Sequence, residues 1–214
     1  MNMDTTIKGI ALKEEKIKEV VEEIINIDVD DGIRFEIKDI SYIREDDEYE
    51  NFRISLTSNV GKTKNPMKLD LTTGDAITLR DIEYTYPCIF SKEDIKIIAY
   101  TLETILAEKY ETIIRRNITT TRMWDFYDLY TLYKLKKDEI DYEILNEEIE
   151  RTSKKRGNQE IMKDYEEIIE DIKEDSYLRS LWDVYLNENK YIGDLYFDKV
   201  VDVVTIISNR INEM

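Results

Sequence analysis

A lysine on the apolar face of a predicted helix is the first residue with a potential for chemistry. Leu102, Leu106, Lys109 and Ile113 follow one another at spacings of four, three and four residues, so they share one helix face. Burying an ammonium group is costly unless it meets a partner or a ligand. Two interpretations follow: Lys109 binds an anionic ligand, or its stem packs while its ammonium reaches water.

A second predicted helix carries charges on an apolar face in the same way. Arg122, Asp125, Leu129 and Leu132 share a face, and Asp128 lies a little further round the helix. The cautious interpretation is an exposed ion pair between Arg122 and Asp125, which stabilises a helix by only a few tenths of a kcal/mol. The alternative is a site in which carboxylates orient groups around a bound ligand.

The chain contains no histidine. This excludes catalytic triads that use imidazole, histidine-rich zinc sites and imidazole general bases. Any catalysis must use carboxylates, lysine, arginine, hydroxyl groups and a hard cation. Mg²⁺ held by carboxylates, the arrangement used for phosphoryl and nucleotidyl transfer, remains compatible with this composition.

The net charge of −17 argues against broad binding of nucleic acid. Residues 109–137 differ from the rest, because seven Lys or Arg and three Asp or Glu give them a local charge of +4. This basic segment includes both predicted charged helix faces. It could bind a nucleotide or the end of an RNA such as tRNA, or it could pair with the acidic C-terminal part of the chain.

The single cysteine, Cys88, excludes a disulfide framework and suits a reducing compartment. No window approaches the ~18 apolar residues of a membrane span, and the N-terminal residues lack the features of a signal peptide. We therefore expect a cytoplasmic protein with no membrane association.

The N-terminal part alternates in the manner of strands around one helix. Strands are predicted over 4–10, 33–43, 52–60, 67–71, 82–90 and 95–100, a helix over 12–27, and a loop over 61–66. In the strand over 67–71, Met67, Leu69 and Leu71 face inward and turn Asp70 to the opposite face. A lone strand aspartate usually faces solvent, so this pattern alone does not predict a metal ligand.

Helical periodicity dominates from Thr101 to the C-terminus, with Thr101 as the predicted N-cap of the first helix. Most carboxylates of these helices lie on polar faces and are expected to be solvated. The predicted fold class is α+β, with a small mixed or antiparallel sheet followed by a helical region. The predicted domains are 1–100 and 101–214.

Four segments resemble the AbiEii/AbiGii abortive-infection toxins, a family of nucleotidyltransferase-like toxins from type IV toxin–antitoxin systems. They are MDTTIKG at 3–9, MKLDLTTGD at 67–75, LETILAEKYETIIRR at 102–116 and TRMWDFYDLYTL at 121–132. The resemblance extends from about Asp4 to Leu135. It implies a nucleotidyltransferase-type sheet, NTP as substrate, Mg²⁺ as cofactor, an antitoxin encoded nearby as partner and a role in phage defence.

The resemblance also assigns roles to residues of the helical region. Lys109 matches the lysine of an A-E-K motif and is implied to contact nucleotide phosphate. Arg122, Asp125 and Asp128 match an R-x-x-D-x-Y-D run. The implied catalytic residues of this region are Lys109 and Asp125, and the implied nucleotide-binding residues are Lys109, Arg122 and Asp128.

The N-terminal match implies the metal site. Asp70 matches a carboxylate that this type of transferase places near its metals, and Asp4 matches the second aspartate of a D-x-D pair. Asp70 is thus implied in catalysis and, with Asp4, in metal binding. The first aspartate of the pair would fall on Asn2, and the family's Gly-Ser turn would precede Met1. The loss of one metal ligand and of the phosphate-holding turn is expected to cost several kcal/mol of transition-state stabilisation, enough to abolish useful turnover.

Three functions remain open from the sequence. The chain is a nucleotidyltransferase toxin that acts on an RNA such as tRNA, or a catalytically impaired member that binds a nucleotide, an RNA or a protein. The third is an acidic interaction protein that uses its helical tail. A missing strand would leave an open sheet edge, so a homo-oligomer is also a hypothesis.

Overall fold

The computed structural model describes residues 2–7, 13–43, 51–73, 81–88 and 94–213. The chain divides into two compact units, Met1–Thr78 and Leu79–Met214. Each unit has its own hydrophobic core, and each is described by itself below. The predicted fold class, α+β with a small mixed sheet and a helical C-terminal region, is confirmed.

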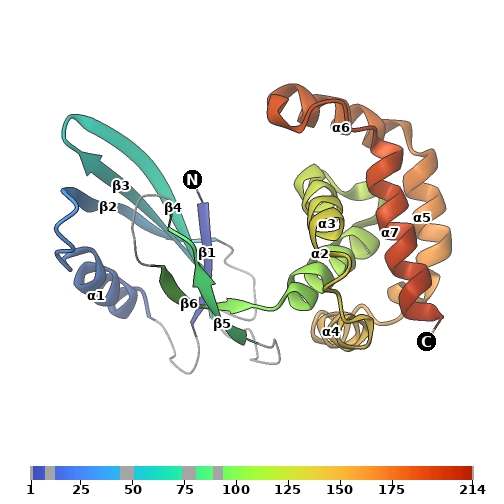
Figure 1. Cartoon of the computed structure of the whole chain (residues 1–214), viewed down its shortest axis with the longest axis horizontal. Coiled ribbons are helices and arrows are strands. Elements are labelled where there is room, and N and C mark those ends of the chain that lie inside the picture. Colours follow the sequence, from blue (N-terminus) through green and yellow to red (C-terminus); the bar gives the residue numbers. More distant parts are fainter. Residues whose placement is uncertain (1, 8–12, 44–50, 74–80, 89–93, 214) are drawn as a thin grey trace. The chain divides into compact units, whose positions relative to one another are not determined.

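The first unit is a mixed four-stranded sheet with one helix (Figure 1). Its elements are β1 (Asn2–Ile7), α1 (Glu14–Ile25), β2 (Ile33–Tyr42), β3 (Asn51–Val60) and β4 (Thr63–Thr73). The strand order is β1-β4-β3-β2. β1 runs parallel to β4, while the pairs β4–β3 and β3–β2 are antiparallel.

The core of the first unit lies between α1 and one face of the sheet. Ile17 and Val21 of α1 are buried together with Phe52 and Ile54 of β3 and Leu71 of β4. The alternation of β3 is strict, and every second residue from 52 to 58 is buried. This alternation was predicted from the sequence and is confirmed. The opposite face of β3 and β4 is left to polar side chains.

The predicted loop over 61–66 is wrong, because β4 already begins at Thr63. Val60 pairs with Thr63, so only two residues connect β3 to β4. Gly61 has a φ of +57°, the left-handed conformation that a two-residue hairpin turn of this kind requires. Pro66 is tolerated within β4 because, among the residues that the structure describes, β1 pairs with β4 from Lys68 onward, so no second described strand needs its missing N–H.

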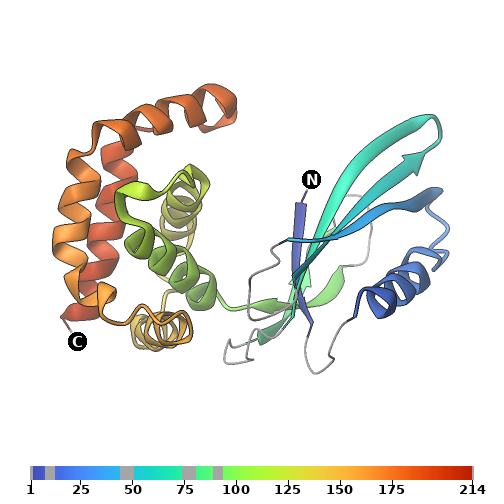
Figure 2. The ribbon, with the colours of Figure 1, turned by 180° about the vertical axis from the view of Figure 1, so that it is seen from behind.

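The second unit begins with a two-stranded hairpin and continues as helices (Figures 1 and 2). Its elements are β5 (Asp81–Tyr86), β6 (Ile95–Tyr100), α2 (Leu102–Arg116), η1 (Asn117–Thr119), α3 (Met123–Lys136), α4 (Tyr142–Lys155), η2 (Ile161–Asp164), α5 (Tyr165–Glu174), α6 (Ser176–Glu188), η3 (Lys190–Ile192) and α7 (Phe197–Asn212). The predicted division of the chain at residue 100 stays a prediction. In the described ranges, no helix is both long and apolar enough to span a membrane.

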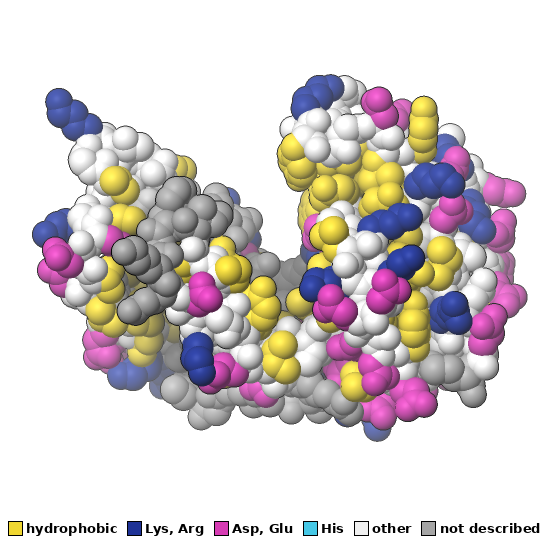
Figure 3. Space-filling model, viewed as in Figure 1, with side chains coloured by type: hydrophobic (Ala, Val, Ile, Leu, Met, Phe, Trp, Pro, Cys, Tyr) yellow, Lys and Arg dark blue, Asp and Glu magenta, His cyan; other side chains and the backbone are white. Residues whose placement is uncertain are grey.

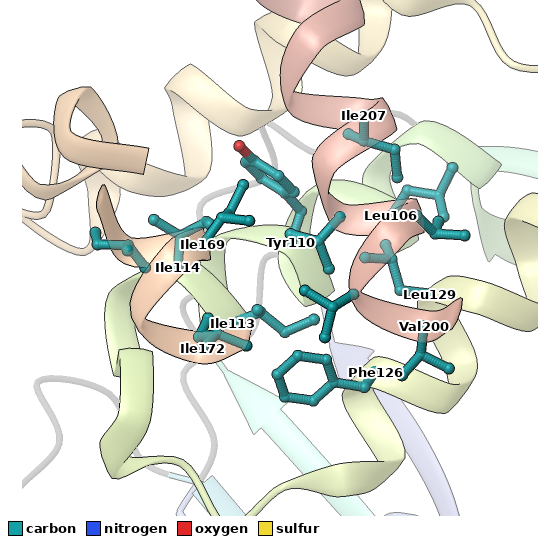
Figure 4. Packing of buried hydrophobic residues seen from close by; sticks show 14 of the residues in the cluster. Leu106, Tyr110, Ile113, Ile114, Phe126, Leu129, Ile169, Ile172, Val200 and Ile207 are labelled. Carbon is teal, nitrogen blue, oxygen red and sulfur yellow. The ribbon is translucent and has the colours of Figure 1, made fainter. Parts of the chain in front are cut away.

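The core of the second unit joins α2, α3, α5 and α7 (Figure 4). Leu106 and Ile113 of α2 meet Phe126 and Leu129 of α3, and α7 adds Val200. All five side chains are fully or almost fully buried. The shared core fixes the faces that α2 and α3 turn toward each other, and this orientation positions their charged residues.

One buried phenol in this core makes the stability of the folded state depend on pH. Tyr110 shares a hydrogen bond of 2.7 Å with Ser208, and burial raises the pKa of Tyr110 to about 12 from its ordinary value of 10.0. The folded state thus keeps this proton longer than the unfolded state does. The stability it contributes is complete below pH 10 and is lost as the pH rises through 12.

We expect the free energy of unfolding to fall by at most about 1.4 kcal/mol for each pH unit between pH 10 and pH 12 through this group alone. Tyr110→Phe lacks the phenol and should lose correspondingly less stability over the same interval. Urea unfolding of both proteins at pH 10 and about one unit higher measures the difference. Equal pH slopes for the two proteins would contradict the prediction.

Candidate functional site

The candidate site lies where α2 faces α3. Thr101 caps α2, as predicted, because its hydroxyl accepts a hydrogen bond of 3.3 Å from the backbone N–H of Thr104. The hydroxyl of Thr120 accepts a hydrogen bond of 3.2 Å from the backbone N–H of Arg122, directly before α3 begins at Met123. A threonine therefore caps α2, and a second threonine holds the backbone just before α3.

Four charged side chains from the two helices form one cluster. Nζ of Lys109 lies 2.6 Å from Oδ2 of Asp128 and 3.5 Å from Oδ1 of Asp125. Nε of Arg122 lies 2.5 Å from Oδ2 of Asp125. We call Lys109, Arg122, Asp125 and Asp128 the α2–α3 charge cluster. The structure brings together all the residues of the helical region that the sequence analysis selected.

Exposure increases across the cluster from Asp125 outward. The side chain of Asp125 is 4% exposed, that of Lys109 20%, that of Arg122 37% and that of Asp128 41%. Asp125 is thus a buried carboxylate that holds two cations, while both cations and Asp128 reach solvent. The interpretation of Arg122 and Asp125 as an exposed ion pair is wrong, because one partner is buried.

The cluster has the composition of an anion site with an internal counter-ion. Asp125 keeps Lys109 and Arg122 close to each other, and two neighbouring cations suit a phosphate group. Asp128 is the more exposed of the two carboxylates at Lys109. If a phosphate oxygen replaced the Asp128 carboxylate at Lys109, one anion would take the place of another and the ammonium would stay neutralised.

Aromatic rings flank the cluster on α3 and α6. The guanidinium of Arg122 lies 5.0 Å from the ring centre of Trp124. Burial raises the pKa of Tyr185, and the negative charge of Asp128 adds to the shift. Tyr185 on α6 is therefore near the Asp128 end of the cluster. The sequence analysis missed both Trp124 and Tyr185, because helix periodicity does not show which rings lie beside a charge.

Asp70 on β4 is held by an arginine of the neighbouring strand. Nε and one terminal nitrogen of Arg53 lie 2.7 Å and 2.6 Å from the two carboxylate oxygens of Asp70. Asp70 faces away from the core, as predicted, and its side chain is 14% exposed. Both of its oxygens are thus engaged in a bidentate ion pair, a partner that the sequence analysis did not identify.

The metal site predicted for Asp4 and Asp70 stays a prediction. Asp4 pairs with Asp70 in the parallel register of β1 and β4, and the side chain of Asp4 lies outside the described residues. Among the residues that the structure describes, no group of three or more Asp, Glu, Cys or His could hold a metal ion. Mg²⁺ is commonly held by one or two carboxylates together with substrate phosphates, so Asp4 and Asp70 are the residues that would hold it.

The comparisons with known proteins concern almost the whole chain. The family described as "Nucleotidyl transferase AbiEii toxin, Type IV TA system" matches residues 3–203. No curated protein matches the sequence. A candidate nucleotidyltransferase from H. pylori shares 17% identity with a TM-score of 0.43, and 99% of this chain covers 79% of that one. JHP933 from Helicobacter pylori shares 18% identity with a TM-score of 0.42, and 99% of this chain covers 77% of that one.

Proposed function

We propose a function from the premise that this chain belongs to the AbiEii family of nucleotidyl transferase toxins from type IV toxin–antitoxin systems. In this proposal, the α2–α3 charge cluster binds the phosphates of a nucleoside triphosphate. The protein then transfers the nucleotide to an RNA acceptor such as tRNA. One observation carries the proposal: Asp125 is buried between Lys109 and Arg122, both of which reach solvent.

Lys109 and Arg122 have different parts in this proposal. Lys109 presents a compact charge from the seam between the helices, and Arg122 presents a planar fork that can bind two phosphate oxygens. Asp125 does not touch the phosphate but keeps the two cations oriented before the nucleotide arrives. Preorganised charges of this kind stabilise the charge that develops during phosphoryl transfer.

The acceptor and the regulatory partner follow from charge and family. Residues 109–137 carry a local charge of +4 in a chain of −17, so an RNA end would be attracted to the same region as the nucleotide. The family implies an antitoxin as partner. A divalent cation, with Mg²⁺ the first to test, would accompany the triphosphate, and Asp70 is the carboxylate that we propose for the transfer step.

A second candidate function is binding without transfer. It is favoured by the ion pair of Arg53, which engages both oxygens of Asp70. If this pair persists when the nucleotide is bound, Asp70 has no free charge for catalysis. The protein would then bind a nucleotide, an RNA or a protein and would not turn over.

Titration calorimetry with each NTP and Mg²⁺ tests the phosphate site. We expect Lys109→Ala to weaken NTP binding at least about tenfold, because one of the two charge-assisted contacts is lost. Lys134→Ala is the matched control, since Lys134 is exposed on α3 in the same basic segment, where its ammonium lies 5.8 Å from the ring centre of Tyr130. It should change the affinity less than about twofold.

The same titration can overturn the proposal. Saturable binding that Lys109→Ala leaves unchanged would place the nucleotide elsewhere. Absence of binding for every NTP at millimolar concentration would remove the nucleotide site from this chain. Circular dichroism of each variant shows whether a loss of binding reflects the site or the fold.

A further inference from the structure

Three tyrosines from three separate elements of the second unit come together beside the α2–α3 charge cluster. The ring centre of Tyr127 on α3 lies 6.2 Å from that of Tyr185 on α6 and 6.2 Å from that of Tyr191 on η3. We call Tyr127, Tyr185 and Tyr191 the tyrosine triad. Figure 3 shows hydrophobic side chains gathered on the surface between α3 and α6.

The inner part of the triad is anchored to the core. Tyr127 and Tyr185 are partly buried and pack against the core of the second unit. Trp182, which is 1% exposed, lies 5.5 Å from Tyr185 between ring centres and donates a hydrogen bond of 2.7 Å to the carbonyl of Leu195. The two inner rings therefore have little freedom to move.

The outer part of the triad is open to solvent. Tyr191 is 74% exposed, although its ring meets Tyr127 edge-on at 77° and its hydroxyl interacts with that of Tyr185. A large exposed ring is usually free to rotate, whereas this one is held on two neighbours. An oriented, exposed ring suits a planar ligand, because little conformational entropy is lost on binding.

The triad and the phosphate site share Asp128. Tyr127 immediately precedes Asp128 on α3, Asp128 pairs with Lys109 at 2.6 Å, and the charge of Asp128 acts on Tyr185. The aromatic rings and the cations therefore neighbour the same carboxylate. A ligand that suits both ends has a polyanionic part and a flat, weakly polar part, which describes a nucleotide.

We propose that the tyrosine triad binds the nucleobase of the nucleoside triphosphate whose phosphates lie on Lys109 and Arg122. This inference rests on the proposed function, since it extends the same site. Tyr191 supplies the exposed stacking surface, and Tyr127 and Tyr185 hold its orientation. Because every base has a π-face, we expect the four NTPs to be bound with similar affinity.

Calorimetry with NTPs and with inorganic tripolyphosphate separates the base from the phosphates. We expect Tyr191→Ala to weaken NTP binding about tenfold and to leave tripolyphosphate binding unchanged, because only the NTP carries a base. Tyr191→Phe keeps the ring and should retain most of the NTP affinity. Lys109→Ala should weaken both ligands. Tyr177→Ala removes a tyrosine of α6 that is 57% exposed, and should change neither.

Each other outcome overturns the inference in a recognisable way. Equal losses for NTP and tripolyphosphate in Tyr191→Ala would mean that the ring only supports the phosphate site. Unchanged NTP binding in Tyr191→Ala, with a loss for a trinucleotide RNA, would assign the ring to the acceptor. If wild type binds NTP through Lys109 and Tyr191→Ala has no effect on any ligand, only this inference fails. If wild type binds neither NTP nor tripolyphosphate, the proposed function fails with it.

Discussion

Replacing Asp125 with alanine is expected to lower the free energy of unfolding of the second unit by about 3 kcal/mol. The side chain of Asp125 is 4% exposed and contacts both Lys109 and Arg122. Its removal leaves two cations close together, one of them only 20% exposed, and Asp128 then remains as the carboxylate at Lys109. This value is near the low end of the range for removing one partner of a buried ion pair, because Arg122 can turn toward water.

The measurement uses a feature of the tryptophans. The chain has two, Trp124 and Trp182, and both lie in the second unit, so tryptophan fluorescence during urea unfolding reports on that unit alone. Asp128→Ala is the matched control. Its carboxylate pairs with the same lysine but is 41% exposed, so we expect a loss below about 1 kcal/mol. Equal losses for the two variants would contradict the assignment of Asp125 as the buried centre of the cluster.

Much of this cluster could be predicted from helix periodicity. The spacing of Leu102, Leu106 and Ile113 puts Lys109 on the core-facing side of α2, and the spacing of Leu129 does the same for Asp125 on α3. Two apolar faces that share a core bring their embedded charges together. Periodicity within one helix does not show the order of burial, which depends on how the two helices are packed.

The partner of Asp70 could not be predicted in the same way. It depends on the register of β3 and β4, which the tight turn after Val60 sets so that Asp70 lies opposite Arg53. The predicted loop over 61–66 would close the hairpin four residues later on β4 and set Asp70 opposite Thr57. A local error in one turn therefore changes the chemical environment of a residue several positions away.

Buried carboxylates of the helical region show a similar limit. Glu148 of α4 was expected to be solvated with its neighbours, but it is fully buried and pairs with Arg151 at 2.8 Å. Glu111 of α2 is also fully buried, with Arg115 at 2.9 Å and Arg156 as a second partner. An arginine one helix turn away is too common in a charged sequence to indicate burial. The helix packing, which the sequence pattern does not specify, decides it.

Asp70→Asn is expected to lower nucleotide transfer to RNA by about 10² to 10³-fold and to change NTP affinity by less than about threefold. The amide keeps the shape of the side chain and removes its charge. Under the proposed function, this carboxylate acts in transfer, whereas the phosphates are bound by Lys109 and Arg122 of the second unit. Incorporation of labelled NTP into a tRNA pool, beside calorimetry on the same samples, measures the two quantities separately.

Arg53→Gln distinguishes a role in transfer from a structural role of the ion pair. Both substitutions break the bidentate contact of 2.6 and 2.7 Å, but only Asp70→Asn removes the carboxylate charge. If Asp70 acts in transfer, Arg53→Gln retains far more activity than Asp70→Asn, because it frees the carboxylate. Equal losses in the two variants would show that the pair matters only for the sheet. Transfer by neither variant nor wild type, with NTP binding intact, would favour the binding function, in which Arg53 keeps Asp70 permanently engaged.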